Sequence, residues 1–474
     1  MKFEDYRSYD ALGLAELVRN GDVTPDELLD TALAAIESIN PALNAFTGVY
    51  EDEARRAIGK GLPDGPFRGV PFSIKDLVTD VAGWPTGNGS RLFAGNVPDH
   101  DAEIVRRYRQ AGLVVMAKTT TPELGLAPTT ESAVSGPTHN PWNLELSPGG
   151  SSGGAAASVA AGIYPMAHAS DGGGSIRIPS AFCGLFGLKP TRARMSLGPD
   201  RGDGWSGMSC QHVVARSVRD SAAALDATAG YVPGDPYTAP TLPSQGGTFL
   251  EATRRDPGRL RFGLILDTAT GAPADEEVRA AARVTADRLV ALGHDVVPAA
   301  WPMATAELGP TSGSIIPAHI AATVDARLAE LGRPQEPDDV ESVTAMLVEA
   351  GRRMTATAYV QAVAAMHGIG RKLAHLLTDL DGLITPTLGR ARQPLGVLTG
   401  DDRERFIREV SPVAAFTSLA NVTGQPAMSV PLGTGDDGFP LGTQIIGRYG
   451  DEATLLSLAA QLEAAYPWFD RVPG

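Results

Sequence analysis

A glycine- and serine-rich segment, Ser147 to Pro190, constrains this chain more than any other part of the sequence. It reads SPGGSSGGAAASVAAGIYPMAHASDGGGSIRIPSAFCGLFGLKP and contains two glycine-flanked serine sites, Ser151/Ser152 and Ser175, 24 positions apart. Because glycine has no Cβ, backbone N–H groups in such turns can approach a ligand closely. A serine placed there is a nucleophile beside an oxyanion hole, which is what acyl transfer needs. A flexible linker is the alternative, but the apolar run from Ile176 to Phe186 follows at once, which is not typical of linkers.

The composition excludes several classes of protein. The chain has 474 residues, of which 43% are hydrophobic and 20% charged, and its net charge of −15 argues against nucleic acid or an anionic membrane as partner. Cys183 and Cys210 are its only cysteines and fit a reducing compartment. We expect no signal peptide and no membrane span, and hence a cytoplasmic location. The histidines are isolated in the sequence, so we expect no metal site.

Apolar strand-like runs alternate with amphipathic helical runs, which predicts an α/β fold with a mostly parallel or mixed sheet. Residues 1–60 are predicted to be helical, with Thr24 as an N-cap and Asn40-Pro41 ending the helix that follows it. Residues 232–258 are predicted to be a long surface loop, and 300–380 an inserted helical lobe. The expected strands are 69–76, 113–117, 163–169, 184–188, 261–266, 294–298, 382–385, 426–431 and 442–447, and the expected helices include 102–111, 153–161, 217–229, 275–292, 320–331, 355–378 and 451–466.

Two short motifs compete for a functional interpretation. Gly202-x-Gly204-x-x-Gly207 matches the dinucleotide-binding fingerprint, but no strand precedes it and no helix pattern follows, so we treat it as chance. Gly150-x-Ser152-x-Gly154 matches the nucleophile elbow of α/β hydrolases, although Ser147-Pro148 stands where that elbow needs a strand. An esterase that uses Ser152 therefore remains an alternative.

Charged residues lie near both serine sites. Lys75 follows the alternating apolar residues of the short strand 69–76, so partial burial is expected, whereas most lysines are solvated. Asp171 and Arg177 flank Ser175, and we expect them to pair and brace its turn. An ordinary salt bridge with no further role is the simpler interpretation of that pair.

Several segments together resemble the amidase signature family. They are Gly69-Val-Pro-Phe-Ser-Ile-Lys75-Asp, Pro148-Gly-Gly-Ser151-Ser-Gly-Gly, Ser170-Asp-Gly-Gly-Gly-Ser175-Ile-Arg-Ile-Pro, Gly187-Leu-Lys-Pro-Thr, Asn140-Pro-Trp-Asn, Val422-Thr-Gly-Gln-Pro and Gly442-Thr-Gln-Ile-Ile-Gly. The resemblance covers about residues 10–466. It implies one domain over 1–474 with a large twisted mixed β-sheet and helices on both faces. Within that domain we expect N-terminal helices at 1–60, a signature core at about 65–230 and the helical lobe at about 300–380.

The resemblance also implies residue roles. Ser175 would be the nucleophile, Ser151 a bridging serine that follows a cis peptide bond, and Lys75 the base. A lysine accepts a proton only when neutral, which requires burial to lower its pKa from about 10.4. The N–H groups of Gly172, Gly173, Gly174 and Ser175 would form the oxyanion hole, with Ser152, Asp171 and Arg177 in support. Many relatives carry Thr where this chain has Gly172, so we expect the pocket edge to differ there.

The implied reaction is hydrolysis of a carboxylic amide through a seryl acyl-enzyme, without cofactor or metal. The substrate would be a small amide, in the branch that acts on linear or cyclic aminohexanoate oligomers, peptide amides and aryl amides; esters or carbamates could enter the same chemistry. The pocket is expected to be lined by Thr120–Thr138, Gly198–Gln211 and part of the lobe, 300–360.

Two other functions remain within the same family. One is a glutamine amidotransferase subunit that frees ammonia for a tRNA-bound substrate, against which the acidic net charge argues. The other is a binding protein without activity, which the presence of all three catalytic positions disfavours. The sequence does not decide whether the chain forms a homodimer.

Overall fold

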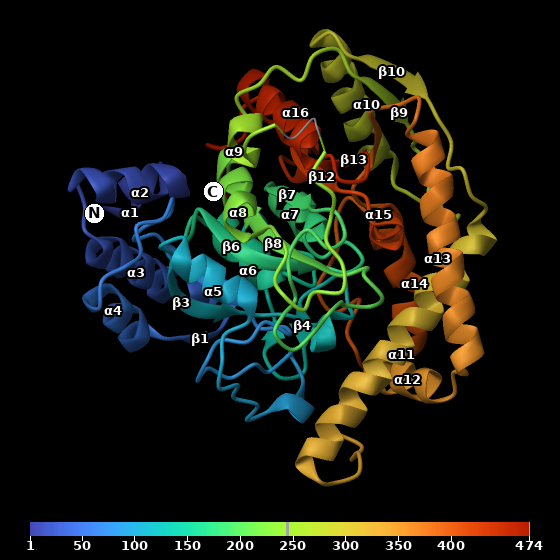
Figure 1. The fold of residues 1–474 in the computed structure, drawn as a ribbon, viewed down its shortest axis with the longest axis horizontal. Helices are drawn as coiled ribbons and strands as arrows, with labels where there is room; N and C mark the ends of the chain where they lie inside the picture. The colour runs from blue at the N-terminus through green and yellow to red at the C-terminus, as the bar shows by residue number, and fades with distance from the viewer. Residues whose placement is uncertain (243–245, 474) are drawn as a thin grey trace.

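The centre of the molecule is an eight-stranded mixed sheet. A computed structural model describes residues 1–242 and 246–473 (Figure 1). The strand order is β10-β9-β11-β13-β12-β7-β8-β6; β9 pairs in parallel with β10 and β11, and the other neighbours are antiparallel. In that order the strands are Asp295–Pro298, Arg261–Leu264, Gly382–Pro386, Pro440–Gly447, Ala427–Thr434, Phe186–Lys189, Cys210–Ala215 and Met166–Asp171. The predicted mixed α/β class is confirmed.

A second sheet of three strands extends the first. Its order is β1 (Phe46–Val49), β3 (Val114–Thr119) and β2 (Pro71–Lys75), with β2 lying against β6 of the large sheet. A further strand pair, β4 (Glu131–Ser132) with β5 (Gly136–Pro137), is two residues long on each side. The prediction that 1–60 is entirely helical was wrong at β1. That strand is short and half exposed, and its antiparallel pairing with β3, about 70 residues away, decides its conformation.

Helices cover both faces of the large sheet. A Cβ on Gly442 would lie 2.5 Å from Ala181 of α7, whereas Thr443 accepts a hydrogen bond from Thr285 of α10. Because consecutive strand residues point to opposite faces, α7 and α10 lie on opposite sides. The helices on and around the sheets are α5 (Glu103–Gln110), α6 (Gly153–Ala160), α7 (Arg177–Cys183), α8 (Val218–Thr228), α9 (Phe249–Ala252), α10 (Glu276–Ala291), α14 (Arg403–Val413), α15 (Ser418–Thr423) and α16 (Glu452–Ala465).

The N-terminal helices pack beside the three-stranded sheet, at the left of Figure 1. They are α1 (Phe3–Arg7), α2 (Ala11–Asn20), α3 (Pro25–Leu43) and α4 (Glu51–Gly59). Thr24 caps α3 as predicted, and its side chain accepts from the Glu27 N–H at 3.2 Å. The predicted end at Asn40-Pro41 was wrong, because α3 continues to Leu43. Pro41 lies in the last turn, where Asn40 closes the helix by accepting bonds from the N–H groups of Asn44 and Ala45.

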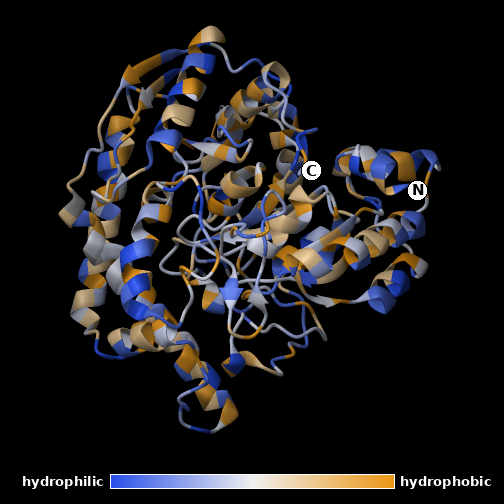
Figure 2. Ribbon diagram, turned by 180° about the vertical axis from the view of Figure 1, so that it is seen from behind, coloured by the Kyte–Doolittle hydropathy of each residue, from blue (hydrophilic) through white to orange (hydrophobic). Residues whose placement is uncertain are grey.

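Three helices form a lobe between β10 and β11. They are α11 (Thr305–Leu331), α12 (Ser342–Arg352) and α13 (Ala356–Leu376), and α11 packs on both of the others. Figure 2 shows both hydrophilic and hydrophobic residues along each outer helix, as expected for helices with one face on a core. Among the described residues, no helix combines the length and apolar character needed to cross a membrane.

Candidate active site

A pocket with a volume of about 670 Å³ lies beyond the last residues of β2 and β6. Four of its lining residues are Ser151, Ser170, Gly172 and Ser175, so the structure brings both predicted serine sites to one cavity. The rest of the lining comes from 77–78, 124–125, 201–209 and 319–323. Each of the three segments predicted to line the substrate pocket contributes residues to this lining.

Lys75 ends β2 and is completely buried. Its Nζ donates to Ser151 Oγ at 2.7 Å and to Ser170 Oγ at 3.0 Å. Burial lowers its pKa well below 10.5, and the charge of Asp171 opposes that shift only in part. The pKa of neighbouring His168 is lowered to about 3 by burial and then by Lys75, so its ring is neutral. A buried lysine that contacts hydroxyls can be neutral near physiological pH.

Ser170 is a residue that the sequence analysis did not single out. It lies on β6 two residues after His168, whose Nδ1 accepts from the Lys75 N–H at 3.2 Å. Residues two apart on a strand share a face, so His168 and Ser170 both point toward Lys75. The expected strand 163–169 stops one residue before Ser170, whereas the observed strand β6 runs to Asp171, so continuing the alternation past 169 was the available signal.

Ser151 and Ser152 precede α6 and have different surroundings. The Gly150–Ser151 peptide bond is cis, and a Cβ on Gly150 would lie 2.2 Å from the Thr129 carbonyl oxygen. Ser152 is buried, and its hydroxyl donates to the Ser170 carbonyl at 3.2 Å and accepts from the Ser170 N–H at 3.3 Å. Among the described histidines, none hydrogen-bonds to Ser152. Its geometry therefore suits a residue that positions Ser170, and gives the elbow interpretation no support.

Asp171 and Arg177 form the expected ion pair. Both are fully buried, and two guanidinium nitrogens of Arg177 lie 2.9 Å from the Asp171 carboxylate. Burial alone would raise the pKa of Asp171, but Arg177 outweighs it and lowers that pKa to about 2. The carboxylate also accepts from the Gly174 N–H at 2.8 Å, so the pair holds the turn that carries Ser175.

Arg177 also ties this turn to the C-terminal part of the chain. It donates to the Thr417 carbonyl at 2.7 Å, to Gln444 Oε1 at 2.6 Å and to Asn421 Oδ1 at 2.6 Å. Asn421 and Gln444 lie in segments that carried the family resemblance, yet no role was predicted for either. Both side chains are buried. A single sequence gives no indication that they contact residue 177.

The turn between β6 and α7 presents backbone donors beside Ser175. Of the four predicted donors, Gly174 differs, because its N–H is already donated to Asp171. Its φ is +137°, and a Cβ there would lie 2.3 Å from Thr417 Oγ1, so the position has room for glycine alone. Within the described residues, the N–H groups of Gly172, Gly173 and Ser175 have no acceptor, and the hydroxyl of Ser175 has no hydrogen-bond partner.

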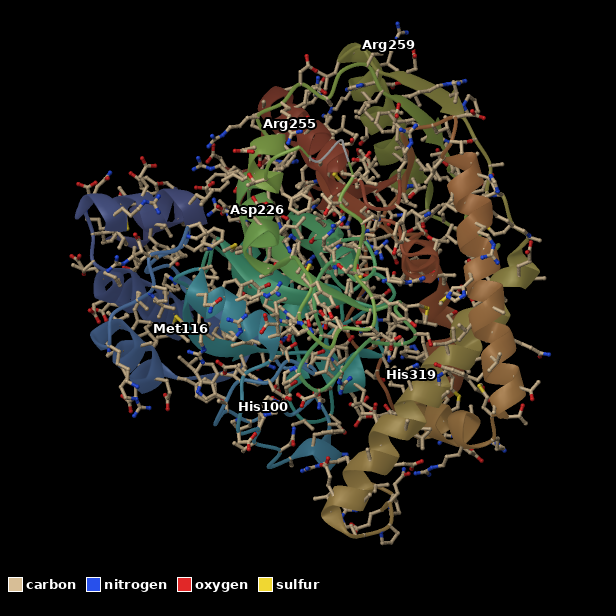
Figure 3. The ribbon with its side chains drawn as sticks, viewed as in Figure 1. His100, Met116, Asp226, Arg255, Arg259 and His319 are labelled. Carbon is tan, nitrogen blue, oxygen red and sulfur yellow. The ribbon has the colours of Figure 1, made fainter. Side chains whose placement is uncertain are left out.

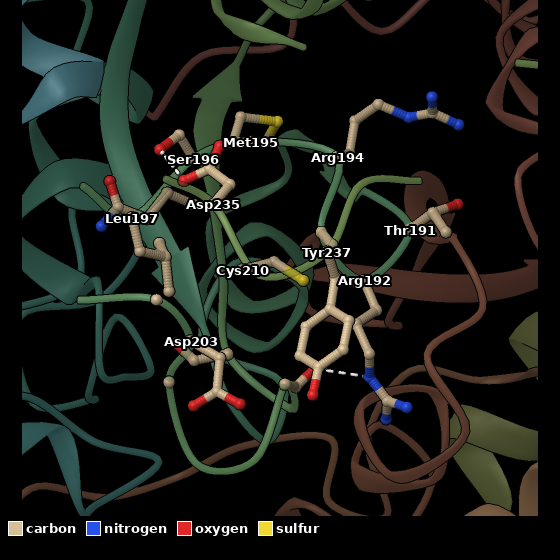
Figure 4. Close-up of a pocket in the computed structure, with 16 residues that line it drawn as sticks. Thr191, Arg192, Arg194, Met195, Ser196, Leu197, Asp203, Cys210, Asp235 and Tyr237 are labelled. Carbon is tan, nitrogen blue, oxygen red and sulfur yellow. Dashed lines mark hydrogen bonds between the residues drawn. The ribbon is translucent and has the colours of Figure 1, made fainter. Parts of the chain in front are cut away.

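The residues of the dinucleotide-like motif form a turn in the pocket wall. Among the described residues, no strand precedes Gly202 and no helix opens at Gly207, which agrees with a chance match. The loop faces a second hollow on its other side, and Arg192 Nε donates there to the Gly207 carbonyl at 2.7 Å (Figure 4).

One cluster has the composition of a metal site. Asp80, His100 and Asp200 bring one ligand atom each within 4.8 Å of the others. His100 (labelled in Figure 3) bonds to Asp200 and Asp99, which raise its pKa to about 9. These residues do not line the pocket of the serines.

Comparison with known proteins agrees with the fold and the pocket. The family model Amidase matches residues 27–456. The 6-aminohexanoate-cyclic-dimer hydrolase of Paenarthrobacter ureafaciens is 41% identical, over 98% of this chain and 96% of its own. A structure of 6-aminohexanoate cyclic dimer hydrolase complexed with substrate superposes with a TM-score of 0.94 at 39% identity, over 99% of both chains. A bacterial aryl acylamidase superposes with a TM-score of 0.87 at 26% identity, over 98% of both chains.

The fold, the pocket and these similarities define an amide hydrolase, an enzyme that cleaves the C–N bond of carboxylic amides. The chain belongs to the amidase family, the family that its signature segments resemble.

Proposed function

We propose that this amidase hydrolyses small linear or cyclic amides through an acyl-enzyme on Ser175, with Ser151 as proton relay and Lys75 as base. The observation that carries the proposal is the 2.7 Å bond between the buried Lys75 amine and Ser151 Oγ, in a pocket that Ser175 also lines. Within the described residues no carboxylate bonds to that amine, so little holds it protonated.

The reaction begins with attack of Ser175 Oγ on the amide carbonyl carbon. The Ser175 proton passes to Ser151 Oγ while the Ser151 proton passes to Lys75 Nζ. The developing oxyanion accepts hydrogen bonds from the unpartnered N–H groups of Gly172, Gly173 and Ser175. The C–N bond then breaks, Ser151 gives its proton to the departing nitrogen, and Lys75 returns one to Ser151. Water repeats these steps on the ester and releases the carboxylate.

The substrate class rests on the relatives. A 41% identical relative hydrolyses the cyclic dimer of 6-aminohexanoate, and the aryl acylamidase is more distant. We therefore expect turnover of a cyclic or linear aminohexanoate amide or an anilide by this chain without partner proteins. An amidotransferase subunit would instead require its partners. A homodimer and a cytoplasmic location stay predictions, the first of which light scattering would test.

The experiment compares four serine variants on an anilide and the cyclic dimer. Ser175→Ala should abolish turnover and labelling by a fluorophosphonate, and Ser151→Ala should lower kcat/KM by several orders of magnitude. Ser152→Ala should be milder, because its hydroxyl bonds only to the Ser170 backbone. Ser158→Ala is the matched control, since Ser158 is equally buried but bonds only to the Ala155 carbonyl of its own helix. Labelling at Ser152 instead of Ser175 would overturn the assignment.

A further inference from the structure

The pocket beside the serines has one wall that the reaction itself does not use. The indole of Trp205 lies where a side chain on residue 172 would be: a Cβ on Gly172 would lie 2.7 Å from Trp205 Cζ3 and 2.9 Å from Cε3. Both residues line the pocket that contains Ser175. Because Cβ contacts that short do not occur, an indole here and a side chain at 172 exclude each other. Gly172 was expected to change the edge of the pocket. The space that its missing side chain leaves is occupied by Trp205, 33 positions later.

The position of Trp205 is held from several sides. Its neighbour Ser206 hydrogen-bonds through Oγ to the Tyr359 hydroxyl at 2.6 Å, and that hydroxyl lies 2.9 Å from His319 Nε2. His319, labelled in Figure 3, projects from α11 of the lobe and also lines the pocket. On the other side of the loop, Arg192 holds the Gly207 carbonyl (Figure 4). The backbone at Trp205 has a φ of +53°, which a bulky residue adopts only where its surroundings impose it.

Apolar residues form part of the pocket lining, together with the polar side chains of Ser209, His319 and Thr323. Leu77, Val78, Leu124 and Ile320 line the same pocket, and Trp205 packs against the apolar cluster that contains Leu124 and Ile320. The charged residues of the lining are Arg201 and Asp203, and both are exposed to solvent. An apolar group is therefore favoured next to the serines.

The indole also lies directly beside the backbone that would bind the oxyanion. Gly172 is one of the residues whose N–H has no acceptor in the described structure, and the ring edge touches the side of that residue where a Cβ would project. A substrate whose carbonyl oxygen reaches this N–H has its carbonyl carbon near the ring, so a group attached to that carbon can contact the indole.

We propose that Trp205 is a specificity-determining residue, whose indole forms one wall of a subsite for an apolar acyl group of the amide substrate. The inference rests on the proposed function of this pocket. The glycine at 172 is what admits the indole, so the two positions act as one unit.

The test is the acyl-chain dependence of kcat/KM for 4-nitroanilides from acetyl to octanoyl. Wild type should favour longer chains. Trp205→Ala should lower kcat/KM at least tenfold for the hexanoyl substrate, mainly through KM, and less than threefold for the acetyl substrate. Trp205→Phe should retain most of the preference. Trp301→Ala is the matched control, because Trp301 and Trp205 both pack on a second apolar cluster, which contains Met366 and Ile369, but Trp301 does not line the pocket.

A double-mutant cycle tests the exclusion between the two positions. Gly172→Ala should lower kcat/KM at least tenfold for the hexanoyl substrate, because its methyl group displaces the indole, but less than threefold for that substrate in the Trp205→Ala background. The proposal is overturned if Trp205→Ala lowers all chain lengths equally, if Trp301→Ala flattens the profile as much, or if Gly172→Ala costs the same in both backgrounds. Thermal unfolding of each variant identifies those that fail to fold. If Trp205→Ala fails to fold, the chain-length profile of Trp205→Phe tests the proposal in its place.

Failure of the proposed function gives a different result. If the wild type hydrolyses no anilide, the same variants are compared by the rate at which methyl to octyl fluorophosphonates label Ser175. A chain-length preference that Trp205→Ala flattens supports the subsite without amide turnover, whereas identical profiles, or no labelling, overturn it.

Discussion

Two buried lysines lie on neighbouring strands, β2 and β3, and have different partners. In the parallel pairing of β2 with β3, Lys118 pairs with Ile74, directly beside Lys75, and both lysine side chains are completely buried. Lys75 bonds to the hydroxyls of Ser151 and Ser170. Lys118 bonds to the Asp76 carboxylate at 3.3 Å, to the Thr86 hydroxyl at 2.7 Å and to a backbone carbonyl.

The different partners of Lys75 and Lys118 show that burial alone does not make a lysine a base. Burial lowers the pKa of both, but at Lys118 the contacting carboxylate of Asp76 opposes the shift and favours the ammonium form. The charge that raises the pKa of Lys75 is that of Asp171, and this carboxylate is bonded to Arg177. We expect Lys75 to act in proton transfer and Lys118 to act in stability.

The largest expected effect is the loss of the Lys75 amine. Lys75→Ala should lower kcat/KM for an amide by about 10³- to 10⁴-fold, because Ser151 loses its proton acceptor. An activated ester should lose less, since its leaving group needs less help from the relay. Lys75→Arg should not restore activity, because a guanidinium stays protonated. Steady-state kinetics with both substrates check this, and substantial rescue by arginine would show that Lys75 acts only as a charge.

Lys118 should instead affect folding. Lys118→Met leaves the Asp76 carboxylate buried without its cation, which should lower the free energy of unfolding by about 3–5 kcal/mol. Lys118→Met/Asp76→Asn should recover part of that loss. Urea denaturation of these variants and of Lys75→Met measures the contrast; equal destabilisation by Lys75→Met would remove the distinction between the two lysines.

The pH dependence of the free energy of unfolding tests the protonation state of Lys75. The folded pKa of Lys75 is lowered, so between that pKa and 10.5 the unfolded chain binds more protons than the folded one. The free energy of unfolding therefore rises with pH through this window, by up to about 1.4 kcal/mol per pH unit. Lys75→Met should show a flatter slope than wild type in urea denaturation at a series of pH values. An unchanged slope would contradict a neutral Lys75.

The smallest effect concerns the second hydroxyl at Lys75. Ser170→Ala leaves the amine with Ser151 as its sole side-chain partner and should lower kcat/KM about tenfold, as expected for one hydrogen bond. The pH at which the rate reaches half its maximum should shift as well. Ser158→Ala serves as the control. If it lowers kcat/KM as much as Ser170→Ala does, the hydrogen bond from Lys75 to Ser170 has no special importance.

Local sequence patterns predicted the parts of the molecule that depend on nearby residues. The cap at Thr24, the helix Glu276–Ala291 and the strand Pro440–Gly447 all follow from periodicity and turn residues within a few positions. β1 was missed because its conformation depends on β3, which lies far away in the sequence.

In the candidate site, too, contacts between nearby residues were predicted and contacts between distant residues were not. The pairing of Asp171 with Arg177 spans six residues and was predicted, whereas the bonds from Arg177 to Asn421 and Gln444 span more than 240. Trp205 was hidden in a motif that we set aside as chance. Its proposed role depends on contact with Gly172, and the sequence pointed to Gly172 but not to the residue that lies against it.

The contacts of Arg177 have a consequence for the order in which the enzyme is made. The serine and its turn are complete once residue 177 has left the ribosome, but the partners that hold the guanidinium come at Thr417, Asn421 and Gln444. Until nearly nine-tenths of the chain has been synthesised, the nascent protein carries Ser175 without the buried network that shapes its turn. We therefore expect this turn to acquire its final shape late in translation.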